Sequence, residues 1–191
     1  MKFVGSHVPG EQAVRPWLTQ RRLLQHAARC SYMVLNGLAT EDGMAWAYHQ
    51  LGNLYADQGK LAEAEQMYQQ ALQGKEKALG AEHTSTLETV NNLGVLYRNQ
   101  GKLAEAEKMC KWALQGREKA LGAEHKSTLD TANNLGNLYK DQGKLAEAEY
   151  MYQRALQDYK KALGVGNSIT YIPALNIIWG LGALSSNVKL I

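Results

Sequence analysis

Several side chains in this 191-residue chain could do chemistry by type, but they lack the partners that such chemistry needs. The pair Gly59-Lys60 recurs twice, yet no Gly stands five residues before it and no Ser or Thr follows it, as a phosphate-binding loop requires. His83 and His125 have no Cys or carboxylate partners at metal-ligand spacing. We therefore expect the Gly-Lys pairs to be turns and the two histidines to be polar surface residues.

Two further groups resemble catalytic side chains in type alone. Glu63 and Glu65 could act as paired carboxylates, but the pair recurs on a helix whose apolar residues lie elsewhere, which is typical of a solvated face. The copies are Glu105 with Glu107 and Glu147 with Glu149. Cys110 would be a nucleophile only beside an activating His, and its place in the apolar pattern points into the core. The sequence therefore predicts no enzyme, no cofactor and no metal site.

These groups all belong to an internal repeat. The segment LGNLY at residues 51–55 returns as LGVLY at 93–97 and as LGNLY at 135–139, which gives a period of 42 residues. The units are residues 45–86, 87–128 and 129–170. Each unit contains two helical patterns joined by Asp-Gln-Gly-Lys or Asn-Gln-Gly-Lys, where Gly can end a helix in a left-handed conformation.

Each unit therefore predicts a helical hairpin. The second helix ends at Leu79-Gly80, and Ser85 with Glu88 offers a capping box for the next helix. Gly52 lies within the first helix, where we expect it to allow close packing against Ala64. A single hairpin cannot cover its own apolar face, so the units must stack. The predicted fold class is all-α, a right-handed α-solenoid with three full repeats and a partial fourth.

The repeated residues resemble the tetratricopeptide repeat. The family's Leu-Gly, Tyr, Ala, aromatic and Ala positions are matched by Leu51, Gly52, Tyr55, Ala64, Tyr68 and Ala71, and most of them recur in the other units. A 42-residue unit is similar to the kinesin-light-chain type of this family, and Cys110 replaces the aromatic residue in the middle unit. The resemblance implies a non-catalytic module in which the first helices line a concave channel for an extended peptide.

One face of the first helices carries the candidate binding residues. At 100° per residue, His49 and Asn53 lie together, away from the face of Leu51 and Gly52. An Asn amide offers a peptide backbone both a donor and an acceptor, while Arg98 or Lys140 can pair with a carboxylate. Acidic residues near the beginning of the same helices mean that the sequence does not predict the charge of the ligand. The candidate groove residues are His49, Asn53, Asn91, Val95, Arg98, Asn133, Asn137 and Lys140.

The two ends of the chain depart from the repeat. Residues 1–44 contain a helical pattern from Arg15 to Asn36 that we expect to pack on the first hairpin. The run VGSHVPGEQ at residues 4–12, followed by QRRLLQHAARCSYMVLNGL at residues 20–38, is similar to the segment that joins an NB-ARC or NACHT nucleotide-binding domain to its repeats in fungal receptor-like proteins. Residues 171–191 predict a truncated fourth repeat, whose uncovered apolar residues favour self-association through the C-terminus.

The balance of charged residues in the chain limits the classes of partner that it could bind. The chain has 21 Lys and Arg against 18 Asp and Glu, a balance that argues against nucleic acid or an anionic membrane surface as the main partner. Two cysteines and no signal-peptide pattern favour a cytoplasmic protein. We therefore expect a module that binds a protein or peptide, as the repeat arm of a nucleotide-binding receptor-like protein. The alternatives are a kinesin-light-chain-like cargo adaptor and a truncated gene product that acts as a free scaffold.

Overall fold

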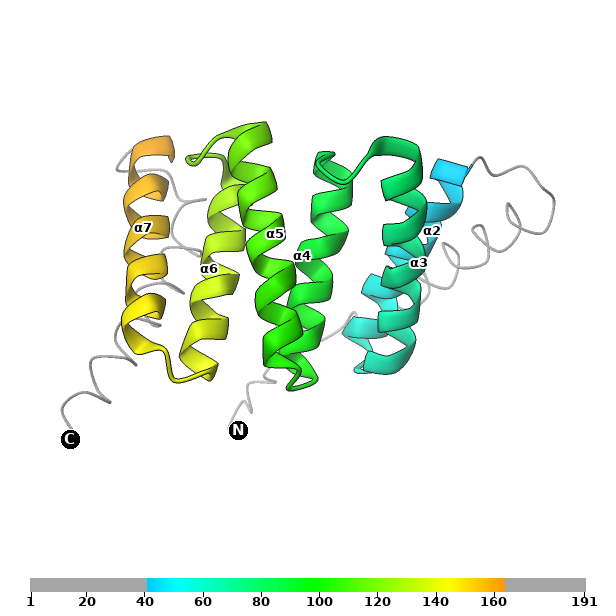
Figure 1. Cartoon of the computed structure of the whole chain (residues 1–191), viewed down its shortest axis with the longest axis horizontal. Helices are drawn as coiled ribbons and strands as arrows, with labels where there is room; N and C mark the ends of the chain where they lie inside the picture. The colour runs from blue at the N-terminus through cyan, green and yellow to red at the C-terminus, as the bar shows by residue number, and fades with distance from the viewer. Residues whose placement is uncertain (1–40, 164–191) are drawn as a thin grey trace, which may run out of the picture. The chain divides into compact units, whose positions relative to one another are not determined.

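The computed structural model describes residues 41–163, which form three stacked helical hairpins (Figure 1). The first helices of the hairpins are α2 (Glu41–Asp57), α4 (Thr84–Asn99) and α6 (Lys126–Asp141), and the second helices are α3 (Leu61–Leu79), α5 (Leu103–Leu121) and α7 (Leu145–Leu163). Within residues 41–163 every element is a helix, so the predicted all-α solenoid of hairpins is confirmed. The helix expected within residues 1–44 lies outside the described residues, as does the partial fourth repeat.

In the turn inside each hairpin, backbone N–H groups donate hydrogen bonds to carbonyl groups of the preceding helix. Gly59 has φ of +73°, a left-handed conformation that glycine adopts readily. Lys60 N–H donates to Tyr55 O at 2.9 Å, and Gly59 N–H donates to Ala56 O at 3.0 Å. These amides finish the preceding helix, so they are not free to cradle a phosphate. The Gly-Lys pairs are turns, as predicted.

The connection between hairpins ends with a histidine that caps the next helix, which was not predicted from the sequence. The Ser85 N–H donates to Nδ1 of His83 at 3.2 Å, and the Ser127 N–H donates to Nδ1 of His125 at the same distance. Helix α4 starts at Thr84, so Ser85 lies inside the helix. The predicted capping box at Ser85 is therefore wrong, because the histidine side chain already takes the orphan N–H that a capping serine would satisfy.

The mid-helix glycines make room for the residue at the aromatic position of the second helix. A Cβ added at Gly52 would lie 2.5 Å from Cδ1 of Tyr68, and one added at Gly136 would lie 2.8 Å from Cε1 of Tyr152. In the middle hairpin a Cβ at Gly94 would lie 2.6 Å from Sγ of Cys110. The nearest neighbours are therefore these side chains and not the alanines that we expected.

Polar contacts then join each hairpin to the next. Gln100 Nε2 donates to Leu61 O at 3.1 Å and to Oε2 of Glu65 at 3.0 Å, while Lys102 Nζ donates to the same Oε2 at 2.8 Å. We call this set of contacts the clasp. Lys102 also lies over the ring of Tyr97 in its own hairpin, with Nζ 5.3 Å from the ring centroid. The turn of one hairpin thus holds the first turns of the second helix in the hairpin before it.

The clasp recurs one repeat later with the same atoms. Gln142 Nε2 donates to Leu103 O at 3.2 Å and to Oε2 of Glu107 at 2.9 Å, and Lys144 Nζ donates to that Oε2 at 2.9 Å. Hydrogen bonds from Lys111 and then Lys144 lower the pKa of Glu107 to about 2. The prediction of a solvated face is therefore wrong for Glu65 and Glu107, because a single-helix pattern does not show the turn that covers them.

We predict that Gly94→Ala destabilises the protein. Its new methyl group would lie 2.6 Å from Sγ and 3.3 Å from the backbone nitrogen of Cys110, and this backbone cannot move away freely. Overpacking costs about 1–3 kcal/mol, against about 1 kcal/mol that Ala gains over Gly within a helix. We therefore expect a net loss of up to about 2 kcal/mol in the free energy of unfolding, measured by urea denaturation with circular dichroism.

Two controls accompany this measurement. Gln115→Ala changes an exposed position of α5 and should leave the unfolding midpoint unchanged. Combining Gly94→Ala with Cys110→Ala removes the sulfur atom, so the double variant should lose less than the sum of the single losses. Strict additivity would show that the two residues do not press on each other.

Candidate functional site

The first helices meet through asparagine side chains. Asn92 Nδ2 donates to Oδ1 of Asn53 at 3.1 Å, which links α4 to α2, and Asn134 Nδ2 donates to Oδ1 of Asn91 at 3.2 Å, which links α6 to α4. Asn91 Nδ2 also lies 3.4 Å from Oδ1 of Asn92. We call this linked set the amide row. It runs across all three hairpins and includes two of the predicted groove residues.

Sequence reasoning missed Asn92 and Asn134. The signal that could have found them is the Asn-Asn pair at residues 91–92, which returns at residues 133–134.

Buried tyrosines fix the orientation of two further amides. Tyr68 Oη donates to Oδ1 of Asn53 at 2.6 Å, and Tyr152 Oη donates to Oδ1 of Asn137 at 2.7 Å. Burial raises the pKa of both tyrosines to about 12, so each hydroxyl keeps its proton and remains a donor. Both asparagines are partly exposed. Since their oxygens accept these protons, their NH₂ groups remain available as donors.

The middle hairpin replaces both members of this pair. Cys110 stands where Tyr68 and Tyr152 stand, and Val95 stands where Asn53 and Asn137 stand. Cys110 is 2% exposed, and burial raises the pKa of its thiol to about 11, so it is not an activated nucleophile. An apolar, partly exposed position therefore lies between two amide positions on this face.

Charged side chains lie at the C-terminal ends of the same helices. Arg98 Nε donates to Oδ2 of Asp141 in the next hairpin, so the charge of Arg98 is partly neutralised. Lys140 occupies the equivalent place in α6 and is partly exposed, and the structure records no ion pair for it within residues 41–163. Lys140 is therefore the more available of the two predicted cations.

Two predicted groove residues lie inside the joints between hairpins. His49 is 2% exposed, with Nδ1 2.9 Å from Oγ1 of Thr89, and Asn91 is 8% exposed. Neither side chain faces an open groove, because the following hairpin covers this edge of the helix. Burial, and then the charge of Lys75, lower the pKa of His49 to about 4, although Glu88 opposes the shift with an oxygen 4.0 Å from Nε2.

Two further residues complete this face. Asn133 is partly exposed, but its Oδ1 is buried and has no hydrogen-bond partner among the described residues. Trp46, which sequence reasoning missed, is 48% exposed near the start of α2. It lies seven residues, or about two helical turns, before Asn53, so both side chains lie on the same face of α2. Glu88 and Asp130 take the place of Trp46 in the other hairpins.

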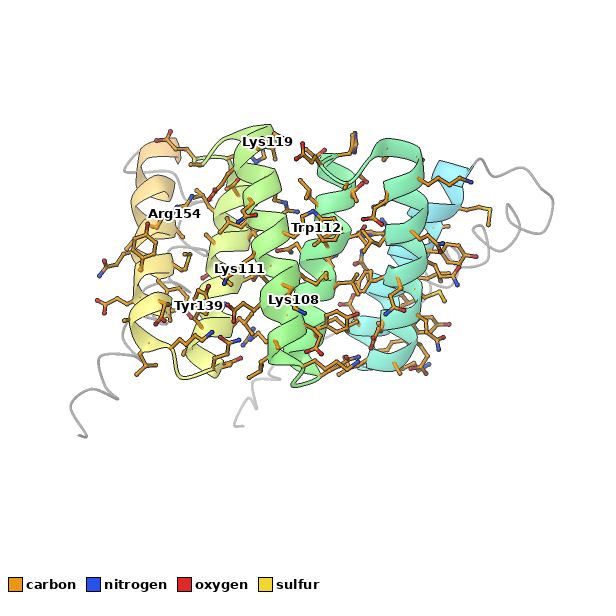
Figure 2. All side chains as sticks on the ribbon, viewed as in Figure 1. Lys108, Lys111, Trp112, Lys119, Tyr139 and Arg154 are labelled. Carbon is orange, nitrogen blue, oxygen red and sulfur yellow. The ribbon has the colours of Figure 1, made fainter. Side chains whose placement is uncertain are left out.

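The side formed by the second helices is a weaker candidate. Lys108, Lys111 and Lys119 follow α5 in Figure 2, which suggests a basic surface. Two of these charges are balanced by contacts within the protein, because Lys111 pairs with Glu107 at 2.6 Å and Lys119 pairs with Glu82 at 2.7 Å. We therefore place the candidate site on the side of the first helices.

A pocket of about 240 Å³ lies between α2 and α3, where Ala45 takes the place of the larger Leu87. No group of three or more His, Cys, Asp or Glu side chains within residues 41–163 is arranged to hold a metal. No helix in that range is both long and apolar enough to cross a bilayer.

The comparisons with known proteins agree with this geometry. The family model of the tetratricopeptide repeat matches residues 43–119 and, overlapping them, residues 85–161. A search of curated proteins finds no match.

Several solved structures share the fold. BtubC (BKLC) from P. vanneervenii is 24% identical with a TM-score of 0.64, over 76% of this chain and 59% of that one. A putative kinesin light chain of P. anserina with nearly identical TPR-like repeats is 20% identical with a TM-score of 0.68, over 90% of this chain and 85% of that one. The N-terminal domain of stress-induced protein-1 from C. elegans is 18% identical with a TM-score of 0.52, over 73% and 98%. At these identities the likeness shows the fold alone.

We predict that Val95→Asn and Cys110→Tyr support each other. Together they restore the hydrogen bond that the outer hairpins make between the aromatic hydroxyl and the amide, whereas each alone leaves one partner without the other. A single hydrogen bond contributes about 0.5–1.5 kcal/mol, so the coupling energy in a double-mutant cycle should be about 1 kcal/mol in favour of the double variant. Urea denaturation of the four proteins measures it, and a coupling energy of zero would contradict the assignment.

We also predict that His49→Asn weakens the pH dependence of stability. The pKa of His49 is about 4 in the folded protein and 6.5 when unperturbed, so the unfolded chain takes up a proton first as the pH falls. Between pH 7 and pH 5 this linkage should cost the native protein about 2 kcal/mol, and Asn, the residue found at this place in the other hairpins, removes the cost. Urea denaturation at both pH values measures the difference.

His125→Asn is the matched control. It makes the same chemical change at an exposed N-cap, a place where Asn also caps well, and it leaves His49 in place. This control should therefore keep the pH dependence of the unaltered chain. An equal loss of pH dependence in both variants would refute the role of His49.

Proposed function

Because this chain belongs to the tetratricopeptide repeat family, we propose that it binds an extended peptide segment of a partner protein on the face of α2, α4 and α6. Repeats of this family generally serve as protein-protein interaction scaffolds without catalysis. The proposed site comprises Asn53, Val95, Arg98, Asn133, Asn137 and Lys140, joined by Trp46. His49 and Asn91 support this face from within the joints.

The observation that carries the proposal is the fixed orientation of two amides. Asn53 and Asn137 each direct their oxygen toward a tyrosine hydroxyl, at 2.6 Å and 2.7 Å, so that the NH₂ group of each remains available as a donor. A peptide in an extended conformation exposes backbone carbonyl groups that can accept such donors. Because the amides are held before the ligand arrives, little side-chain entropy is lost when the peptide binds.

The residues around these amides define the kind of peptide that would fit. Val95 and Trp46 offer apolar contacts, the first between the two amides and the second near the start of α2. Lys140 offers a positive charge at the end of α6, while Glu88 and Asp130 add negative charge at the beginnings of α4 and α6. We therefore expect a peptide with an apolar side chain near its centre.

The kind of protein in which this binding module works is part of the same proposal. The similarity of residues 1–44 to the segment before the repeats of fungal receptor-like proteins supports a role as the repeat arm of a nucleotide-binding receptor. The alternative of a kinesin-light-chain-like adaptor is supported by the fold shared with the P. anserina structure. A free scaffold is the third setting.

Replacing the amide NH₂ group of these asparagines with a carboxylate oxygen tests the site. Asn53→Asp and Asn137→Asp keep the oxygen that accepts the tyrosine proton but replace the donor with an acceptor. Peptides selected from a random displayed library on the whole chain are the probes. We expect the double variant to bind them at least about tenfold more weakly in fluorescence anisotropy, because two hydrogen bonds to peptide carbonyls become repulsive contacts.

Asn99→Asp is the matched control, because it adds the same charge at an exposed position where the other hairpins already carry Asp57 and Asp141. Its affinity should equal that of the unaltered chain. Equal binding by the double variant would place the peptides elsewhere and refute the proposed face.

A further inference from the structure

Helix α5 of the middle hairpin differs from its counterpart α3 mainly on one exposed side. Both helices are 19 residues long, and they differ at five positions, of which Cys110 and Arg117 are buried. The other three are Lys108, Lys111 and Trp112, which stand where α3 has Gln66, Gln69 and Gln70. Because Lys111 and Trp112 follow Lys108 by three and four residues, the three side chains lie close together on the helix surface. We call these three residues the α5 patch.

The α5 patch lies in the middle hairpin, which has one described hairpin before it and one after it (Figure 1). Lys108 and Lys111 are exposed, and Trp112 is partly exposed. Figure 2 shows all three on α5, so the patch belongs to the side of the second helices. It is therefore separate from the face of α2, α4 and α6.

The surroundings of the patch hold more positive than negative charge. Glu107 accepts hydrogen bonds from Lys111 at 2.6 Å and from Lys144 at 2.9 Å, so one carboxylate serves two ammonium groups. The structure records no ion pair for Lys108 within residues 41–163. Glu105, which is exposed three residues before Lys108, adds one negative charge. Three ammonium groups thus stand against two carboxylates.

The same place in the first hairpin has the opposite balance. Glu65 accepts a hydrogen bond from the ammonium group of Lys102 at 2.8 Å, and its other oxygen accepts one from the neutral amide of Gln69 at 3.2 Å. Together with Glu63, the counterpart of Glu105, this gives two carboxylates against one ammonium group. The lysines of the α5 patch therefore reverse the local charge, although a clasp of the same atoms is kept.

The indole of Trp112 gives the patch an apolar part beside these cations. Tryptophan is enriched among the residues that contribute most to protein interfaces, and the methylene groups of lysine add apolar contact area. Each ammonium group has three donors, so Lys111 can bind a second carboxylate besides Glu107. These groups together suit a ligand that carries carboxylates next to an apolar side chain.

We propose that the α5 patch binds an acidic segment of a partner protein. Carboxylates of that segment bind Lys108 and Lys111, and an apolar side chain beside them packs on Trp112. This contact is additional to the peptide site on the first helices and does not depend on it.

The sequence argues against other occupants of the patch. Residues 1–40 and 164–191 contain a single acidic residue, Glu11, so these parts of the chain cannot supply an acidic segment. Nucleic acid suits the patch less well, because its phosphates would also approach Glu105 and because the net charge of the whole chain is only +3.

Subtractive selection on the whole chain tests the inference. Peptides from a random displayed library are selected on the unaltered chain and depleted on a variant that combines Lys108→Gln, Lys111→Gln and Trp112→Gln. This variant carries on α5 the three residues that α3 already carries, so its circular dichroism spectrum should be unchanged. We expect the recovered peptides to be rich in Asp and Glu beside an apolar residue.

Fluorescence anisotropy of the recovered peptides then separates charge from apolar contact. Lys108→Gln combined with Lys111→Gln should weaken their binding at least about tenfold, and Trp112→Gln alone should weaken it by a similar factor. Rising salt should weaken binding to the unaltered chain and have less effect on binding to the double lysine variant.

Lys119→Gln is the matched control, because it removes the same charge from α5 outside the patch, where Lys119 pairs with Glu82. It should bind the recovered peptides like the unaltered chain. The triple variant should still bind peptides that depend on Asn53 and Asn137, so failure of one site is distinguishable from failure of the other.

Three results would overturn the inference. The first is a selection that recovers no peptide or recovers peptides without an excess of acidic residues. The second is binding of the recovered peptides that survives the double lysine change. The third is a labelled single-stranded DNA oligonucleotide that binds the unaltered chain more tightly than these peptides do, which would assign the patch to nucleic acid.

Discussion

The clasp between successive hairpins is the interaction on which the described structure depends. A helical hairpin of this length has an apolar side that only a neighbour can cover. The same Gln-Gly-Lys turn that ends the first helix of one hairpin also binds a glutamate and a backbone carbonyl of the hairpin before it, as Gln142 and Lys144 do with Glu107 and Leu103. Local chain reversal and long-range stacking are therefore specified by one short segment.

The amide row has two roles for a related reason. Asn53 accepts a hydrogen bond from Asn92 of the next hairpin and another from Tyr68 of its own, so its position depends on how the hairpins are stacked. A peptide that binds across several hairpins would contact groups whose orientation the joints determine. Binding and stacking would then be thermodynamically linked, because a ligand that prefers the stacked form also stabilises it.

The internal repeat made most of the fold predictable from the sequence, but the contacts between successive hairpins were not predictable from it. The period of 42 residues and the turn glycines locate the helices, since both depend on residues close in sequence. The placement of His49 and Asn91 could not be read from one helix, because it depends on which edge the next hairpin covers. Likewise, Glu65 and Glu107 read as surface residues until the following turn is placed beside them. The histidine cap was missed because His is not among the common capping residues.

The paired replacement of Tyr by Cys110 and of Asn by Val95 carries a consequence for the history of the repeats. If the middle hairpin once matched its neighbours, two substitutions were needed, and the intermediates are unequal. Loss of the asparagine first would leave a buried tyrosine hydroxyl without an acceptor, which costs about 1–3 kcal/mol. Loss of the tyrosine first would leave an asparagine that is partly exposed and can turn to water. That order would also leave a cavity where the buried tyrosine ring had packed, so each order passes through an intermediate less stable than the outer hairpins.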